Sequence, residues 1–170
     1  KLNGNFKTQD GILYGANGSE SGNYNKHHGY AMWCMAEHWW YTRDRKWMEK
    51  AAPGLIKACD WITRERQATM TTYEDGSRAF EYGLLPAGGL EDVQDYWYWN
   101  ATNACAAWGF DSVSAALADY GHPEAARLAK EAKAFHEDVV TAIANARVRA
   151  PVVKLRDGTY IPAFTSEVYT

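Results

Sequence analysis

The apolar residues of the N-terminal half recur every three to four positions, a spacing that predicts amphipathic helices. Between residues 30 and 42 the pattern is apolar on nearly every side, which predicts a buried inner helix. Asp44 can cap a short helix that extends through Lys50, and Pro53 stands near the start of a longer helix, where proline is tolerated. We therefore expect an inner helix followed by an outer one.

The C-terminal half predicts a second pair of helices. A continuous apolar stripe extends from about Gln94 to Tyr120 and predicts a long inner helix, which Gly121 ends. His122-Pro123 begins the next helix, and its charged side predicts an outer helix that ends before Pro151. This pair repeats the order of the first pair, inner and then outer.

Three segments lack the helical period. Residues 1–28 are polar and rich in glycine, which predicts a loop. Residues 69–82 are polar, with a turn signal at Asp75-Gly76. Residues 152–161 predict a small C-terminal β-hairpin. The fold class predicted from these patterns is all-α, with stacked αα-hairpins followed by one β-hairpin.

The candidate chemistry is concentrated in residues 83–100, which open with glycines and a proline. Glu91, Asp92 and Asp95 follow, and then four consecutive aromatic residues and Asn100. On a helix Glu91 and Asp95 would share a face, and their repulsion would raise the pKa of at least one. A carboxyl that stays protonated can act as a general acid, and flat rings can stack on sugars. Alternatively, the acidic residues only complement the dipole of a helix N-terminus.

Composition narrows the classes of partner. The net charge of −3 and the lack of a Lys/Arg-rich run argue against nucleic acid, and no apolar run approaches the length of a membrane span. The 8 Trp and 11 Tyr residues suit a carbohydrate-active protein. Cys34, Cys59 and Cys105 are expected to be buried thiols without a disulfide framework or metal spacing, so we expect no metal and no cofactor. The chain begins at Lys1 without a signal peptide, which leaves its localisation open.

The order of these motifs resembles the six-hairpin glycosidases, whose catalytic domain is an (α/α)6 toroid. The resemblance covers roughly residues 24 to 165. It is carried by residues 41–48 and 53–62 for the first hairpin, by Gly83-Leu84-Leu85-Pro86 with residues 91–100 for the segment of the general acid, and by residues 115–126 for the turn into the next outer helix.

This resemblance implies a glycoside hydrolase that acts on an oligo- or polysaccharide by inversion. It implies that Glu91 or Asp92 is the general acid, and we expect Asp95 to stay ionised and to orient a hydroxyl or an arginine. A closed toroid has twelve helices, and about four are predicted here. Residues 1–170 are therefore expected to form one domain that is part of a larger catalytic domain. The remaining hairpins, or a self-association partner, would complete it.

In the superfamily the active site lies at the N-terminal ends of the inner helices. The segments 22–29 and 88–100 precede two inner helices here, so we expect them to lie side by side. Eight residues are expected to contact the sugar, namely His27, His28, Trp33, Glu37, Trp97, Trp99, Asn100 and Asn103.

Two other functions remain open. A non-catalytic carbohydrate-binding or structural helical piece is favoured by the lack of a recognisable catalytic base. A polysaccharide lyase could use His27 or His28 with a tyrosine. The alternative for the histidine pair is a polar loop with solvent-exposed imidazoles. Glu37 and His38 could likewise be core residues with satisfied hydrogen bonds.

Overall fold

The computed structural model describes Gly11 and residues 24–90 and 93–169. Four long helices dominate these residues: α1 (Lys26–Thr42), α2 (Arg45–Glu65), α3 (Asn100–Tyr120) and α4 (Ala125–Arg149). A 3-10 turn, η2 (Arg66–Thr69), extends α2. Two antiparallel hairpins complete the fold, β1 (Gly88–Leu90) with β2 (Val93–Trp97) and β3 (Val152–Lys154) with β4 (Tyr160–Pro162). The mostly helical fold with a C-terminal hairpin is confirmed, and closure into a toroid stays a prediction.

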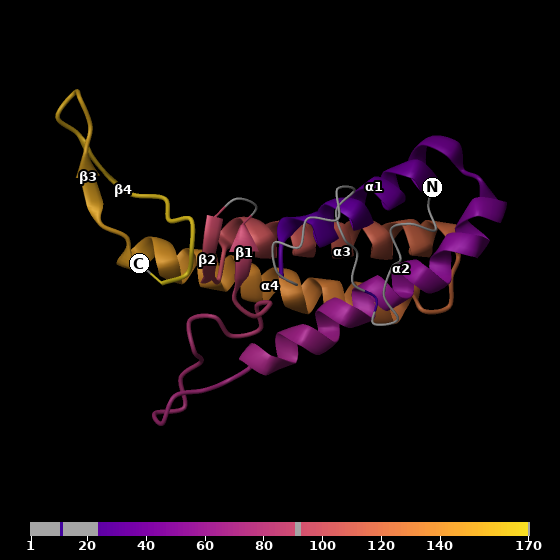
Figure 1. The fold of residues 1–170 in the computed structure, drawn as a ribbon, viewed down its shortest axis with the longest axis horizontal. Coiled ribbons are helices and arrows are strands. Elements are labelled where there is room, and N and C mark those ends of the chain that lie inside the picture. The colour runs from indigo at the N-terminus through magenta and orange to yellow at the C-terminus, as the bar shows by residue number, and fades with distance from the viewer. Residues whose placement is uncertain (1–10, 12–23, 91–92, 170) are drawn as a thin grey trace.

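Helix α3 is the centre of the arrangement, because it has the most extensive contacts with both α1 and α4 and also touches α2. Figure 1 shows α1 and α3 side by side and running in the same direction, whereas α2 and α4 run back beside them. The N-terminal ends of α1 and α3 therefore lie at the same end of the molecule as the β1–β2 hairpin. None of the described helices is long and apolar enough to span a membrane.

The α1–α3 contact depends on glycine. A Cβ atom added to Gly29 would collide with the backbone carbonyl of Cys105, and one added to Gly109 would collide with the carbonyl of Gly29. At this point the two helices touch through their backbones, which only glycine permits.

The apolar stripes of all four helices meet in one core. Phe110 and Leu117 of α3 are completely buried, as predicted for an inner helix. The other fully buried large side chains of the core include Met32, Met48, Leu55, Ile62, Leu84, Leu85, Leu128 and Phe135. Cys59 is buried within this core, Cys105 is half-buried and Cys34 is exposed. The prediction of three buried thiols was therefore wrong for Cys34 and holds fully only for Cys59.

The side chains of Asn25 and Asp44 cap helices α1 and α2. The Asn25 carboxamide oxygen accepts from the His27 N–H (2.9 Å), so α1 begins four residues before the predicted start. Asp44 caps α2 by accepting from the Trp47 N–H (3.1 Å), as predicted. The predicted break near Pro53 was wrong, because α2 continues through it. Pro53 lies on the exposed side of the helix. Its neighbours on the buried face pack into the core, and this packing keeps the helix continuous through the proline.

The ends of α3 differ in how well the sequence predicts them. Gly121 adopts a left-handed conformation (φ 88°) and donates to the Leu117 carbonyl (3.1 Å), as predicted for its role at the C-terminus. The predicted start near Gln94 was wrong, because residues 93–97 form β2 and the helix begins only at Asn100. Aromatic residues favour strands as well as helices, and here the pairing with β1 decides between them.

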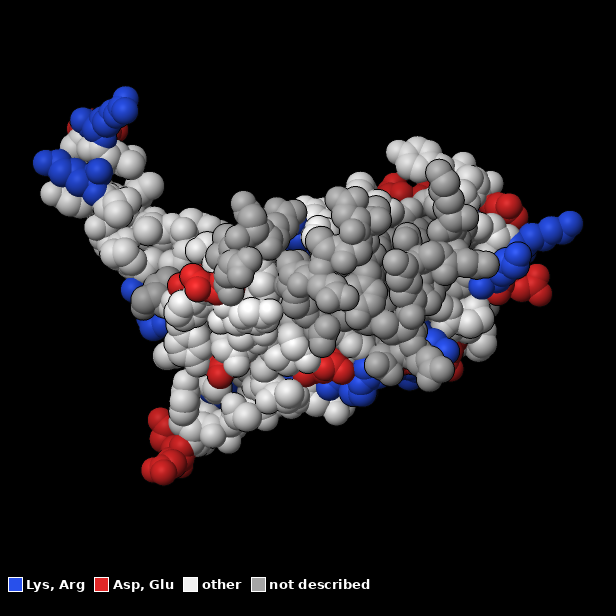
Figure 2. Space-filling view, viewed as in Figure 1, with Lys and Arg blue, Asp and Glu red and all other residues white. Residues whose placement is uncertain are grey.

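The C-terminal β3–β4 hairpin is confirmed and projects from the end of α4 (Figure 1). Asp157 accepts from the Thr159 N–H (2.9 Å), and Gly158 takes a positive φ of 87°. Figure 2 shows basic side chains at the end of this hairpin and acidic side chains at the end of the loop before β1. The turn predicted at Asp75-Gly76 in that loop is confirmed, since Gly76 has a positive φ of 82°.

Candidate functional site

The candidate site lies around the β1–β2 hairpin and the first turn of α3. A Cβ atom added to Gly88 would collide with the backbone of Tyr24, so the segment before α1 touches the start of β1. This confirms, for the described residues, that the segments preceding α1 and α3 lie side by side. Glu91 and Asp92 lie outside the described residues, so their roles stay predictions.

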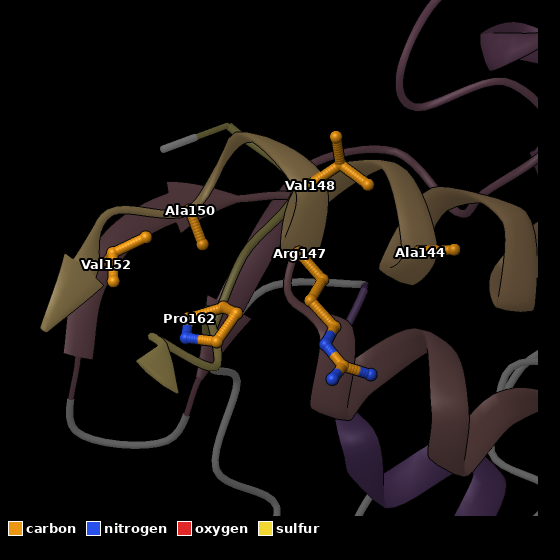
Figure 3. A pocket seen from close by; sticks show the side chains of 6 residues that line it. All are labelled: Ala144, Arg147, Val148, Ala150, Val152 and Pro162. Atoms are coloured by element: carbon orange, nitrogen blue, oxygen red, sulfur yellow. The ribbon is translucent and has the colours of Figure 1, made fainter. Parts of the chain in front are cut away.

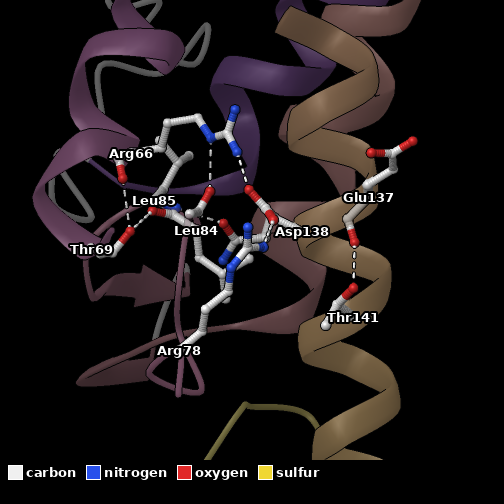
Figure 4. A network of polar contacts seen from close by, with 10 residues as sticks. Arg66, Thr69, Arg78, Leu84, Leu85, Glu137, Asp138 and Thr141 are labelled. Atoms are coloured by element: carbon white, nitrogen blue, oxygen red, sulfur yellow. Dashed lines mark hydrogen bonds and ion pairs between the residues drawn. The ribbon is translucent and has the colours of Figure 1, made fainter. Parts of the chain in front are cut away.

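A buried ion pair fixes the start of the segment that carries the acidic residues (Figure 4). The guanidinium of Arg66, only 2 % exposed, donates from Nε to the Gly83 carbonyl (2.8 Å) and pairs through Nη2 with Asp138 on α4. Burial lowers the pKa of Arg66, and the Asp138 carboxylate opposes that shift. Arg78 reaches the other oxygen of Asp138 (3.3 Å) from the loop. The chain is thereby anchored eight residues before Glu91.

Two further polar contacts hold the residues that follow Gly83. Thr69 donates its hydroxyl to the Leu84 carbonyl (2.6 Å). Asn103 accepts from the Leu85 N–H (2.9 Å) and donates to the Trp99 carbonyl (3.0 Å). The Asn103 side chain, predicted to contact sugar, is 2 % exposed and binds the backbone on both sides. Its observed contacts are those of a residue that positions the hairpin against α3.

Trp99 and Asn100 form the junction between the β1–β2 hairpin and α3. The Trp99 indole donates to the Gly88 carbonyl (2.8 Å), and its ring is 9 % exposed. Asn100 donates its backbone N–H to the Ser166 carbonyl and its carboxamide to the Thr165 carbonyl, both at 2.9 Å. The C-terminal segment is thus held against the start of α3.

A second carboxylate reaches the site from this C-terminal segment. Glu167 forms a bridge with Trp99, two residues after β2, and its Oε2 atom is buried without a hydrogen-bond partner among the described residues. Burial raises the pKa of Glu167, and the nearby negative charge of Asp95 raises it further. Sequence reasoning missed Glu167, because residues 163–170 show no regular period that would place them beside β2.

Residues 95–97 of strand β2 are exposed to solvent. Asp95 is exposed on the strand, and the helical face that it was expected to share with Glu91 does not exist, since residues 93–97 are extended. Trp97 is 43 % exposed and its neighbour Tyr96 63 %. An accessible carboxylate and flat aromatic surfaces therefore occur together beside Glu167.

Of the two adjacent histidines, His28 is the more deeply buried. His28 is buried, its Nε2 lies 3.2 Å from the Ala58 carbonyl, and its ring lies 4.5 Å from that of Trp61. Burial lowers the pKa of His28 to about 4, so the ring is neutral near pH 7. The alternative of an exposed loop was wrong for this pair, because both residues belong to α1 and neither side chain is fully exposed.

The remaining two residues expected to contact sugar lie further along α1. Trp33 stacks on Trp108 of α3 with ring centroids 4.6 Å apart, and Glu37 is half-buried one turn later. Glu37 is roughly 16 Å along the helix from Lys26, given a rise of about 1.5 Å per residue. His38 is exposed and packs on Trp47 (4.4 Å between ring centroids), so the interpretation as a core residue was wrong for it.

An open cavity of about 350 Å³ lies beside the junction of the hairpin and α3. Among the described residues it is lined by Leu90, Asn100, Ala101, Ala104, Ile143, Phe164, Thr165 and Ser166. Leu90, which lines the cavity, directly precedes Glu91 in sequence, and Glu91 is one of the two candidates for the general acid. The Oδ1 atom of Asn100 is buried and has no hydrogen-bond partner among the described residues.

A second cavity, of about 400 Å³, lies between the end of α4 and the β3–β4 hairpin. Figure 3 shows Ala150, Val152 and Pro162 at one side of it and the side chain of Arg147 at another. It has no carboxylate among its described lining residues. The cavity at the hairpin–α3 junction has none among its described lining residues either, but Glu167 and Asp95 lie near each other at that junction.

No group of three or more His, Cys, Asp or Glu side chains suited to a metal ion occurs within the described ranges. Comparisons of the chain with protein-family models, with curated protein sequences and with solved structures found no match.

Proposed function

We propose that this chain is part of a glycoside hydrolase of the six-hairpin type, which cleaves a glycosidic bond with inversion by general acid–base catalysis. The observation that carries the proposal is the common N-terminal end of the parallel helices α1 and α3. Asp95 and Glu167, from segments far apart in sequence, meet there beside exposed aromatic rings. An inverting hydrolase needs two carboxyl groups on opposite sides of the bond, about 6.5–9.5 Å apart.

The roles follow from charge and exposure. Glu91 or Asp92 donates the proton to the leaving oxygen, and Glu167 is a third candidate donor because its raised pKa favours the protonated form. Asp95, which is accessible on β2, activates water or orients a sugar hydroxyl. Trp97 supplies a flat ring on which the C–H face of a sugar stacks.

The proposal also includes the (α/α)6 toroid, of which these four helices would form two hairpins. Large aromatic side chains on α1 and α3 support this part of the proposal, since Tyr30, Trp40 and Trp108 are each at least 36 % exposed and Tyr41 is 86 % exposed. Apolar surface of this kind is typical of contacts with other protein. Further hairpins, or a second copy of the chain, would cover it.

The alternative is a carbohydrate-binding or structural helical piece without turnover. It is favoured by the contacts of Trp99, Asn100 and Asn103, whose polar groups bind the backbone of the hairpin and of the C-terminal segment. These three side chains hold the site together, whereas Asp95 and Trp97 remain accessible. Binding of a glycan without product formation would favour this alternative.

The experiment determines the anomeric configuration of the first product. The complete protein, with the further hairpins that would close the toroid, is incubated with a panel of natural oligosaccharides of both anomeric types, and the product is followed by proton NMR before mutarotation. We expect release of a sugar whose anomeric configuration is opposite to that of the cleaved bond. Retention of configuration would contradict the inverting mechanism, and the absence of any hydrolysis would contradict the assignment as a hydrolase.

A further inference from the structure

The β3–β4 hairpin projects from the end of α4 as an arm with apolar side chains on both of its faces (Figure 1). Cross-strand partners share a face, so Val153 and Ile161 lie on one face and Lys154 and Tyr160 on the other. The large apolar side chains that are each at least 41 % exposed are Val152, Val153, Leu155, Tyr160 and Ile161. A two-stranded hairpin is at best marginally stable in water on its own, and exposed apolar surface is typical of contacts with other protein. The hairpin, residues 152–162, is called the basic arm below.

A second projection, the loop of residues 70–78, leaves the same end of the molecule in the opposite direction. In Figure 1 this loop, in magenta, points down at the left, whereas the basic arm points up. A bridge between Thr72 and Arg78 closes the loop, which leaves Glu74 and Asp75 at its end. Tyr73 beside them is 46 % exposed. This loop, called the acidic loop below, therefore also combines apolar surface with charge.

The ends of the two projections carry opposite charge (Figure 2). Lys154 and Arg156 supply the positive charge of the basic arm, and Glu74 and Asp75 supply the negative charge of the acidic loop. All four side chains are exposed, and none forms an ion pair with another of the described residues. The one acid of the basic arm, Asp157, accepts hydrogen bonds within its own turn. The two ends are thus complementary to each other, and they point apart within one molecule.

We infer that the basic arm of one copy of the chain docks on the acidic loop of a second copy, in a two-fold symmetric dimer. Because arm and loop point in opposite directions from one end, a half-turn about the viewing direction of Figure 1 brings each arm beside the loop of the other copy. Both contacts then form together, as a two-fold interface requires. A second copy is favoured over an unrelated partner because the chain itself carries both complementary surfaces. Opposite charges orient such an interface, and the exposed apolar side chains become covered.

The test is sedimentation velocity of the complete protein and of two charge-reversed forms. The first form combines Lys154→Glu with Arg156→Glu in the basic arm. The second combines Glu74→Lys with Asp75→Asn in the acidic loop, and asparagine can still accept the hydrogen bond from the Ser77 N–H.

The wild type should be a dimer at about 100 μM, which exceeds the micromolar dissociation constant of a weak interface, and salt should weaken it by screening. Each reversed form alone brings like charges together, so its dissociation constant should rise more than about tenfold. A wild-type protein that stays monomeric would overturn the inference and leave the basic arm to a different partner.

A mixture of the two forms tests which surfaces meet. In a mixed dimer an acidic arm faces a basic loop and a basic arm faces an acidic loop, so equimolar mixing should restore the dimer. Lys46→Glu with Lys50→Glu is the control, because both lysines are exposed at the start of α2, at the far end of the molecule (Figure 1). This control should keep the wild-type dissociation constant, with all forms folded by circular dichroism. A mixture that stays monomeric, or a control that dissociates as the reversed forms do, would overturn the inference.

Discussion

Helix α3 and the β1–β2 hairpin that precedes it are consecutive in sequence and are held in place by different forces. α3 is buried among three other helices and touches α1 through glycine backbones. The hairpin is held by individual hydrogen bonds from Asn103 and Trp99, and by the chain before it that Arg66 anchors. Close packing therefore fixes the helical body, whereas a few polar contacts fix the hairpin, and the candidate chemistry lies on the latter.

The largest effect should come from the ion pair that anchors the hairpin segment. Asp138→Ala leaves the guanidinium of Arg66 buried without its carboxylate partner, which should lower the free energy of unfolding by about 3–5 kcal/mol. Chemical denaturation measures the change. Arg78→Ala is the control, because Arg78 is 62 % exposed and pairs with the same carboxylate, so its loss should cost about 1 kcal/mol or less. Equal losses would show that the buried pair does not anchor the segment.

The second effect concerns the helical body. Gly29→Ala should destabilise the protein by about 1–3 kcal/mol or more, because its new methyl group would press against the Cys105 carbonyl and force α1 away from α3. Thermal unfolding measures the difference. Gly76→Ala is the control, since no atom lies within 4 Å of its added Cβ and only the backbone strain at φ 82° opposes it. A Gly29 variant that is as stable as the Gly76 variant would contradict the close approach of the two helices.

The third effect is a pH dependence in the same body. Protonation of His28 is opposed by burial, so its pKa is about 4 in the folded chain and near its ordinary 6.5 in the unfolded chain. The unfolded state binds the extra proton between these values. Stability is therefore complete above pH 6.5 and falls by up to about 1.4 kcal/mol per pH unit as the pH decreases toward 4.

Comparison of the wild type with His28→Leu measures this contribution. The difference in unfolding free energy between the two proteins should change with pH between 6.5 and 4 and stay constant above 6.5. A difference that is constant over the whole range would contradict the burial of a neutral imidazole next to Trp61 and the Ala58 carbonyl.

The same contrast explains which features the sequence predicts. The apolar period of residues 100–120 reports burial on a helix directly, so Phe110 and Leu117 were placed correctly in the core. The aromatic run at 96–99 fits a strand as well as a helix, and only its pairing with β1 distinguishes them. At Pro53 the sequence predicted a helix boundary, but α2 continues through it. The packing of the neighbouring residues overrides the local signal of the proline.

The candidate site was predictable only in part, for a related reason. The carboxylates at 91–95 stand out as a local cluster, and Asp95 is accessible as a catalytic group must be. Glu167 enters the site through a bridge between segments 68 residues apart, and no local pattern encodes that contact. Asn103 was expected to contact the sugar, but its polar groups hold the hairpin backbone.

The most direct test of the central claim is kcat of the complete enzyme for a natural glycoside in three single variants, Glu91→Gln, Asp92→Asn and Glu167→Gln. Glu49→Gln, at an exposed position on α2, is the control. If the carboxylates at the hairpin–α3 junction supply the proton, at least one of the three variants should lower kcat by about 10²–10⁴-fold with the fold intact. The loss should be smaller for substrates with good leaving groups, which need little protonation. Near-wild-type kcat in all three variants would contradict the account and leave these carboxylates with a structural role alone.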